Sequence, residues 1–271
     1  AIVNGYKAPF LDREAMSRSN NDVFRQGVEF KWMYDLFLFD RDLRSITFVY
    51  LTRAEAVVRT SVVYAFCHNH PEREAYLERP NYCDSKGYLV PRAFKGDKAN
   101  LHSKNLSDLM SRLNDKLVVR SHSRDFIKHY MKAHGYVPLW VLSNDLTFGN
   151  IIHLYQLMQQ NDRREACTII ARVSKRDSAQ GYLTERKLLR TINILNDFRN
   201  LCAHDERLYC ARPGNVGYSD MVVHLFNVLP REEVAQFARD ITALLASYEG
   251  RLHNVDARSL LKDMGFEIGE A

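Results

Sequence analysis

Residues 184–209 read TERKLLRTINILNDFRNLCAHDERLY, and the pattern of apolar residues in this stretch decides the fold. Apolar side chains recur there at spacings of three and four residues, which is the period of one face of an α-helix. The spacing therefore predicts a helix from residue 184 to about residue 203. The side chains on its apolar face are Leu188, Ile192, Leu195, Phe198 and Cys202.

The same helical period extends through most of the chain, which shows neither the alternation typical of strands nor an internal repeat. Pro71 ends one periodic segment, Gly135 ends another, and Pro230 opens the last. We therefore expect an all-α protein, with a short break near Ser121. The predicted helices cover residues 21–39, 41–68, 105–134, 145–160, 184–203 and 230–249.

A chain of 271 residues is long enough for one large domain or two small ones, with a sizeable core in either case. Glycine, proline and mixed charges concentrate between Pro80 and Asn100, which favours a loop there. The chain opens on Ala1 without a signal peptide, so we expect that an N-terminal portion is missing. The prediction is a single domain over 1–271, with a helical core at about 21–70 and 105–249 and a loop insertion at about 71–104.

Composition and charge exclude several classes of protein. Hydrophobic residues make up 46% of the chain and charged residues 26%, as in a globular domain and unlike a disordered chain. No run approaches the roughly 18 apolar residues of a membrane span. Five cysteines without a C-x-x-C pair predict reduced thiols in a cytoplasmic protein without a zinc ribbon. The net charge of +5 favours an anionic partner but does not require one.

The chemically informative residues are Arg199, Asn200 and His204, at the end of the predicted helix 184–203. Imidazole exchanges protons near neutral pH, and guanidinium keeps its charge and matches phosphate oxygens in pairs. The two groups therefore suit phosphodiester cleavage without a metal ion. Five residues of α-helix turn about 500°, so the two side chains leave the axis about 140° apart. Their convergence requires a long reach by the arginine, a helix that loosens near His204, or a second copy of the chain.

A simpler interpretation of the same spacing stays open. An arginine that pairs with a carboxylate, followed by a histidine that caps the helix C-terminus, gives the same R-x4-H pattern. This pattern is frequent by chance, so the spacing by itself does not decide between a structural and a catalytic role.

Several segments together resemble one protein family. Arg199-Asn200 followed by His204 is similar to the R-N-x3-H motif of HEPN ribonucleases. The segment from Cys202 to Tyr209, with CAH and RLY, resembles the Abi-like (abortive infection, AbiD/AbiF) branch of these enzymes. The resemblance spans nearly the whole chain. The other similar segments, in the order of the family, are NGY at 4–6, PF at 9–10, FDRDLR at 39–44, RAE at 53–55, RT at 59–60, PLWVL at 138–142, TFG at 147–149 and LY at 154–155.

The resemblance implies a HEPN-type helical bundle with additional helices, acting as a metal-independent endoribonuclease in bacterial antiphage or toxin–antitoxin systems. It implies a homodimer that completes the site, and RNA as the substrate and as a bound small structured non-coding RNA. His204 is then the general acid or base, Arg199 stabilises charge on the phosphate, and Asn200 orients one of these groups. The ribose 2′-OH is the expected nucleophile, with a 2′,3′-cyclic phosphate as product. No cofactor or metal ion and no membrane contact are expected.

The alternative function is a non-catalytic RNA-binding protein in a ribonucleoprotein with a small structured RNA. In that case Arg199 and His204 only bind phosphate.

Two basic stretches, 92–128 and 163–190, are candidates for contacts to RNA backbone phosphates. The second leads directly into the helix that carries Arg199. For any single lysine or arginine, the alternative is a solvated helix face. The candidate RNA-binding residues are Lys175, Arg176, Arg186, Lys187, Arg190 and Arg207.

Two further groups are weaker candidates. Glu55 and Arg59 are four residues apart, which predicts an ion pair within one helix, and the resemblance raises the alternative that Glu55 faces the active centre. Cys67, His68 and His70 are of the types that bind metals. A helix end followed by proline points them in different directions, so we expect structural roles for them.

Overall fold

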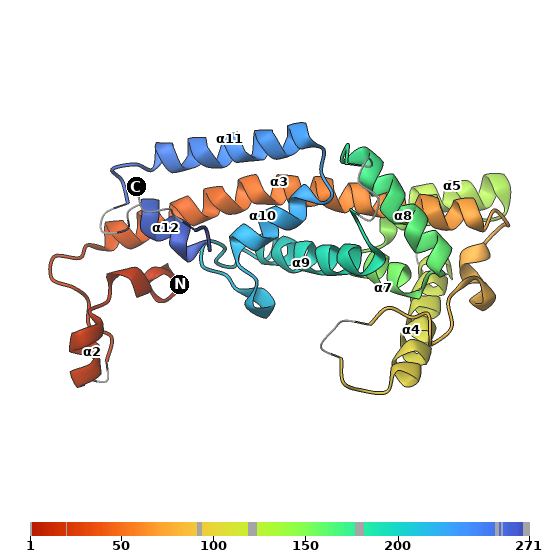
Figure 1. Ribbon diagram of the computed structural model, residues 1–271, viewed down its shortest axis with the longest axis horizontal. Coiled ribbons are helices and arrows are strands. Elements are labelled where there is room, and N and C mark those ends of the chain that lie inside the picture. Colours follow the sequence, from red (N-terminus) through yellow and green to blue (C-terminus); the bar gives the residue numbers. More distant parts are fainter. Residues whose placement is uncertain are drawn as a thin grey trace. The chain divides into compact units, whose positions relative to one another are not determined.

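The computed structural model of the chain describes residues 2–19, 21–90, 94–118, 124–176, 182–252, 255 and 257–267. Within these ranges the regular elements are helices, and the extended pairing is limited to two isolated bridges, Leu11 with Phe24 and Tyr82 with Met158. The predicted all-α class is confirmed (Figure 1).

The first long helix is continuous, where the sequence predicted two. Helix α3 runs from Phe30 to Asn69, so residues 21–29 precede it and the predicted break at residue 40 is absent. Asp40, which lies at the predicted break, is fully buried in the helix and hydrogen bonded to other segments. The helix ends just before Pro71, as predicted.

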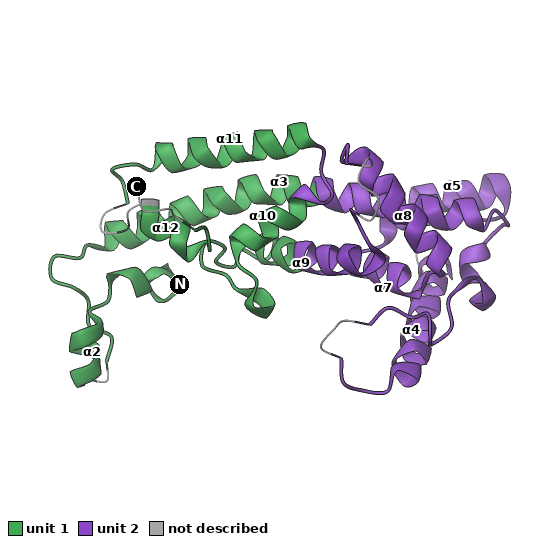
Figure 2. Ribbon diagram, in the orientation of Figure 1, with its two compact units in different colours: residues 1–52, 197–225, 231–271 green, residues 53–196, 226–230 purple. Residues whose placement is uncertain are grey.

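The described chain divides into two compact units, which we treat separately (Figure 2). Unit 1 comprises residues 1–52, 197–225 and 231–271, and unit 2 comprises residues 53–196 and 226–230. Helix α3 and helix α9, which runs from Glu185 to Ala203, each contribute residues to both units.

Unit 1 is organised around the first part of α3. Thr47 on α3 shares a hydrogen bond of 2.7 Å with the hydroxyl of Tyr218, and Tyr50 donates one of 2.6 Å to Asp240. These contacts fix two later helices against α3. The other elements of unit 1 are α1 (Ile2–Tyr6), η1 (Ala8–Phe10), α2 (Arg13–Ser19), η6 (Pro213–Asn215), α10 (Tyr218–Phe226), α11 (Arg231–Ser247) and α12 (Ala257–Asp263).

Helix α10 lies between the predicted helices 184–203 and 230–249, where no helix was predicted. It begins directly after Gly217, whose amide donates to the Asp220 carboxylate at 2.9 Å. The helix buries Tyr218, Met221 and Leu225 at helical spacing. The helix is short and lies between Gly217 and Pro230, so the sequence shows too few turns for its helical period to be recognised. Helix α11, in contrast, was predicted within a few residues.

Unit 2 contains the end of α3, the start of α9 and the elements that lie between these two helices in the sequence. Helix α4 starts at Lys98 because the Asp97 carboxylate accepts hydrogen bonds from the amides of Ala99 at 2.8 Å and Asn100 at 3.2 Å. The elements are η2 (Ala75–Leu77), η3 (Arg79–Asn81), α4 (Lys98–Val118), α5 (Asp125–His134), α6 (Leu139–Leu142), η5 (Ser143–Asp145), α7 (Phe148–Leu157) and α8 (Gln160–Val173).

The predicted helix 105–134 is thus two helices, and the expected break at Ser121 lies outside the described residues. Gly135, with φ of 73°, ends α5 as predicted. The predicted helix 145–160 starts later, at Phe148, because Thr147 and Asn150 form a reciprocal capping box.

The segment between α3 and α4 is partly buried, where the sequence predicted a surface loop. Tyr76, Tyr82 and Tyr88 are nearly inaccessible. The hydroxyl of Tyr76 donates to the Val137 carbonyl at 2.7 Å, and that of Tyr82 donates to the Tyr76 carbonyl at 2.6 Å. Aromatic anchors therefore hold a segment whose glycine and proline content favoured a loop.

In the described residues, none of the helices has the length and apolar character needed to cross a membrane.

Candidate functional site

The end of helix α9 carries the three residues singled out for catalysis. The amide of His204 donates to the Asn200 carbonyl at 3.0 Å, so the α-helical turn is intact up to His204. Asp205 then adopts a left-handed conformation with φ of 55°, and the Glu206 amide closes on the Leu201 carbonyl at 3.0 Å. This is the geometry of a Schellman-type helix end.

The side chains of Arg199 and Asn200 contact each other, and His204 lies exposed one helical turn after Asn200. The guanidinium of Arg199 is 3.5 Å from the Asn200 side-chain oxygen, and its carbon lies 5.8 Å from the ring centroid of Phe48 on α3. His204 is exposed at the helix end. Because the helix does not loosen before His204, the two side chains leave the axis about 140° apart. Arg199 and His204 therefore approach one phosphate only if the arginine reaches around the helix or if a second copy of the chain supplies one of the two groups.

A buried carboxylate on α3 holds the turn that follows His204. Asp40 accepts hydrogen bonds from the amide of Tyr209 at 2.8 Å and of Leu208 at 3.1 Å, and from the hydroxyl of Tyr6 at 2.7 Å. Burial raises the pKa of Asp40, and these hydrogen bonds oppose the shift. The side chain thereby fixes the path of the chain after the helix.

Arg44, one turn after Asp40, completes this anchor. Its guanidinium lies 2.7 Å from the Asp40 carboxylate, donates to the Glu206 carbonyl at 3.3 Å, and approaches Asp205 at 3.8 Å. The sequence analysis quoted both residues for their resemblance to a family motif but assigned them no role. The available signal was a pair of opposite charges four residues apart on an otherwise apolar helix face.

A pocket of about 340 Å³ opens beside the same turn. Arg207 and Arg212 line it, together with Cys210. Arg207 also donates to the Gly5 carbonyl at 2.7 Å, which fastens the turn to α1. Burial raises the pKa of the Cys210 thiol, so this thiol is protonated at neutral pH. Glu206 lines the pocket as well, so its charged side chains leave an excess of one positive charge next to the end of α9.

Two of the candidate RNA-binding residues gather on one aromatic ring in unit 2. Lys187 lies 4.4 Å from the centroid of the Tyr182 ring and Arg176 lies 5.7 Å from it. Arg176 also donates to the Tyr182 hydroxyl at 2.7 Å, which in turn donates to Asn227 at 3.0 Å. The ring thus holds two cations in place.

The other candidates in this basic stretch differ in accessibility. Lys175, Arg186 and Arg190 are exposed, and Arg186 and Arg190 lie one turn apart on α9. Arg163, which the sequence analysis counted in the same stretch, is buried and paired with Glu185 at 2.8 Å. It is a structural residue and is withdrawn as an RNA contact.

In the first basic stretch, 92–128, two cations have a buried partner, whereas Lys95, Lys104 and Arg112 are exposed. Lys116 and Arg124 both pair with the buried Asp145, at 2.9 Å and 3.0 Å. Arg92 and Arg120, which also belong to this stretch, lie outside the described residues.

Glu55 and Arg59 form the predicted ion pair within α3, with 2.5 Å between their charged atoms. Arg59 also donates to the carbonyls of Ser143 at 2.5 Å and Leu146 at 2.6 Å. The arginine therefore ties α3 to the segment before α7, all within unit 2.

The two histidines at the end of α3 have carboxylate partners on α8. His68 lies 2.6 Å from Glu165, and His70 lies 3.1 Å from Asp162. These contacts give both imidazoles structural roles. In the part of the chain that the structure describes, no group of three or more histidine, cysteine or acidic residues has a metal-binding arrangement.

A comparison with known families matches residues 2–210 to the family described as Abi-like protein. The chain belongs to the Abi-like family. The match to this Abi-like protein includes Arg199, Asn200 and His204 and ends at Cys210, directly after the anchored turn. No curated protein and no solved structure matches the chain.

Membership gives this Abi-like protein a role in abortive infection, which is a form of defence. Helices α10, α11 and α12 lie beyond the matched residues.

Proposed function

We propose that this Abi-like protein is a metal-independent endoribonuclease of a bacterial antiphage or toxin–antitoxin system. In this proposal Arg199, Asn200 and His204 form a HEPN-type site that two copies of the chain complete. The observation that carries the proposal is the intact helical turn between Asn200 and His204. It directs Arg199 and His204 away from each other within one copy, so facing helix ends of two copies bring an arginine and a histidine to one phosphate.

His204 has the exposure that a proton-transfer group needs. It takes the proton from the ribose 2′-OH or gives one to the leaving 5′ oxygen, and the histidine of the second copy performs the complementary transfer. The 2′ oxygen bonds to phosphorus while the bond to the 5′ oxygen breaks. The products are a 2′,3′-cyclic phosphate and a 5′-hydroxyl, and DNA is not cleaved.

Arg199 stabilises the negative charge that builds on the phosphate oxygens during this attack. Asn200, 3.5 Å from the guanidinium, orients it. The half-buried position of Arg199 beside Phe48 limits its hydration and strengthens its interaction with an anion.

Positive charge on both units supports RNA as the partner. In unit 1, Arg207 and Arg212 line the pocket next to the end of α9. In unit 2, Arg176 and Lys187 are held on the Tyr182 ring, and Arg186 and Arg190 are exposed. We assign these groups to contacts with the phosphates of the substrate and of a small structured non-coding RNA.

The test is cleavage of total bacterial RNA in EDTA by the wild type and by His204→Ala. His68→Ala is the matched control, since it also removes an exposed imidazole. The absorbance ratio of each preparation reports copurifying RNA. We expect cleavage by the wild type and the control and none by His204→Ala. Cleavage that requires a divalent metal ion, or that persists in His204→Ala, would overturn the proposal.

A second substrate checks the nucleophile. An RNA that carries a single 2′-deoxy nucleotide on the 5′ side of a mapped cleavage site should not be cleaved at that site, and its other sites should still be cleaved. The wild type and His204→Ala can both copurify with tightly bound RNA. If neither protein cleaves added RNA after the copurified RNA has been removed, the protein is the non-catalytic RNA-binding alternative.

A further inference from the structure

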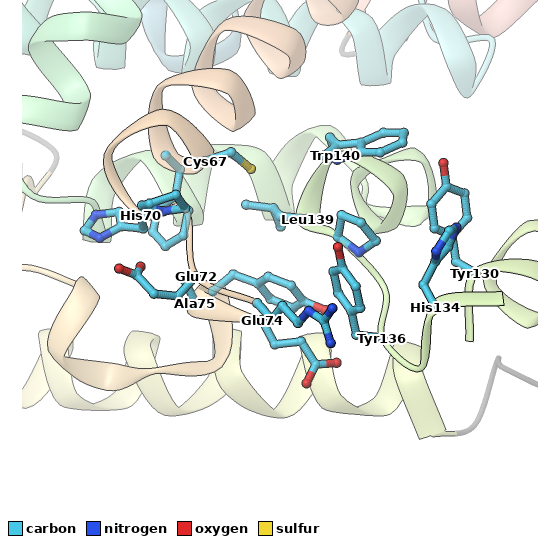
Figure 3. Close-up of a pocket in the computed structure, with 15 residues that line it drawn as sticks. Cys67, His70, Glu72, Glu74, Ala75, Tyr130, His134, Tyr136, Leu139 and Trp140 are labelled. Carbon is cyan, nitrogen blue, oxygen red and sulfur yellow. The ribbon is translucent and has the colours of Figure 1, made fainter. Parts of the chain in front are cut away.

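Unit 2 contains a pocket of about 380 Å³ that the proposed nuclease function does not use (Figure 3). The end of α3, the segment after it, the end of α5 and the start of α6 form its walls. Its volume lies in the range of small-molecule sites. Figure 3 shows the rings of Tyr130, Tyr136 and Trp140 gathered on one side of the pocket.

Two of these rings form walls that meet at a right angle. Tyr130 and Trp140 have centroids 5.4 Å apart and an angle of 90° between their planes. Trp140 is 54% exposed although it is the largest side chain of α6. Core packing does not account for a tryptophan that lines a pocket and remains this accessible.

The third ring already holds a cation. The guanidinium carbon of Arg73 lies 4.8 Å from the centroid of Tyr136. The face of an aromatic ring attracts positive charge through its quadrupole, so this contact shows the kind of group that the pocket favours.

The charged residues of the pocket also favour a cation. Glu72 and Glu74 line it together with Arg73, His70 and His134, which leaves an excess of one negative charge when the histidines are counted as neutral. The Cys67 thiol adds none, because burial raises its pKa and keeps it protonated. A polyanion such as RNA would meet two carboxylates here, whereas an organic cation would meet carboxylates and ring faces.

The pocket is held open by the surrounding structure. His70 is fixed by Asp162 at 3.1 Å, and Tyr76 by its hydrogen bond of 2.7 Å to the Val137 carbonyl. Glu74 has φ of 55°, a left-handed conformation that few residues other than glycine adopt. Such strain persists only where the surrounding contacts enforce it.

We propose that this pocket is a binding site for the alkylammonium group of an organic cation. The ammonium group sits in the corner between Tyr130 and Trp140, and Glu72 and Glu74, which line the pocket away from these two rings, add negative charge to it (Figure 3). Two sources carry this group, a free small cation and a methylated lysine side chain of another protein. Both present the same chemistry to the rings.

The test compares choline with 3,3-dimethylbutan-1-ol, which has the same shape with carbon in place of the charged nitrogen. The chain has two tryptophans, so Trp32→Phe leaves Trp140 as the only one, and selective excitation of tryptophan then reports on the pocket. We expect choline to change its fluorescence saturably, and the neutral alcohol to bind at least about tenfold more weakly. A trimethyllysine peptide titrated alongside distinguishes the two sources by its relative affinity.

Calorimetric titration of variants with choline tests whether choline binds in this pocket. Trp140→Ala should weaken choline binding at least about tenfold, and Trp140→Phe should restore part of it. The matched control is Tyr64→Ala, which removes another exposed aromatic ring that does not line the pocket. Equal binding of choline and the neutral alcohol, unchanged choline binding in Trp140→Ala, or a response to cytidine 5′-monophosphate instead of choline would each overturn the proposal.

Discussion

The carboxylate of Asp40 accepts a hydrogen bond of 2.8 Å from the backbone amide of Tyr209, 169 residues further along the chain. Asp40 is fully buried, and its second partner, the guanidinium of Arg44, is also buried. One helix of unit 1 thus determines the path of the chain after His204. The contact is a structural requirement of the site, whatever chemistry His204 performs.

Removal of this carboxylate should destabilise the protein strongly. Asp40→Ala leaves the Arg44 charge buried without its partner and two backbone amides without an acceptor. The loss of one member of a buried pair costs about 3–5 kcal/mol. Urea denaturation followed by circular dichroism measures the change in the free energy of unfolding, with the exposed Glu249→Gln as control. A loss below about 1 kcal/mol would mean that the anchor does not hold the turn.

A smaller coupling is expected between Thr47 and Tyr218, whose hydroxyls share a buried hydrogen bond of 2.7 Å. Tyr218→Phe leaves the Thr47 hydroxyl buried without this partner, at a cost of about 1–3 kcal/mol. The double variant Thr47→Val with Tyr218→Phe removes both polar groups and should be more stable than the sum of the single changes predicts. Strict additivity in the same denaturation experiment would contradict the hydrogen bond.

The amphipathic helices were predictable because their signal is local. Helix α9 shows its apolar face every three or four residues, and the structure places it at Glu185–Ala203 against a prediction of 184–203. The continuity of α3 was not predictable in this way. The polar side chains at Asp40 and Arg44 suggest a break, and they are tolerated in the helix because their partners lie far away in sequence.

The residue types of the candidate site were also accessible from sequence, but its geometry was not. The spacing of Arg199 and His204 gives the angle between their side chains only if the helix is intact. The hydrogen bond from the His204 amide to the Asn200 carbonyl shows that it is. The aromatic pocket of unit 2 had no sequence signal, since its rings come from separate elements with no common period.

The stability of unit 2 should fall on acidification because of His153. Burial lowers the pKa of this imidazole, and the nearby Arg112 lowers it further, against a smaller opposite effect of Asp108. Between the lowered pKa and the ordinary value of 6.5, the unfolded chain binds a proton that the folded chain does not. The free energy of unfolding therefore rises with pH across this window.

His153→Gln tests this dependence. The difference in urea midpoint between pH 5.5 and pH 7.5 should shrink in the variant, because glutamine does not titrate. The exposed His129→Gln serves as control and should keep the wild-type difference. An unchanged difference in His153→Gln would assign the pH dependence to other groups.

The proposed composite site predicts complementation between two inactive variants. Arg199→Ala and His204→Ala should each abolish RNA cleavage alone, since each removes one of the two essential groups from both copies. Mixed after mild dissociation, they form heterodimers in which one copy supplies Arg199 and the other supplies the single remaining His204, so that water has to make the complementary proton transfer. Cleavage should then recover in part, and fluorescence-labelled RNA resolved on a denaturing gel measures it.

The double variant Arg199→Ala with His204→Ala is the matched control for this mixture. Paired with either single variant it leaves the heterodimer without one of the two groups, so no cleavage should return. The intact helical turn makes the expectation sharp, because it directs the two side chains of one copy about 140° apart. If the mixture of single variants stays inactive while copurification of two differently tagged variants shows that heterodimers form, one copy alone must bring both groups to the phosphate, and Arg199 must reach around the helix to do so.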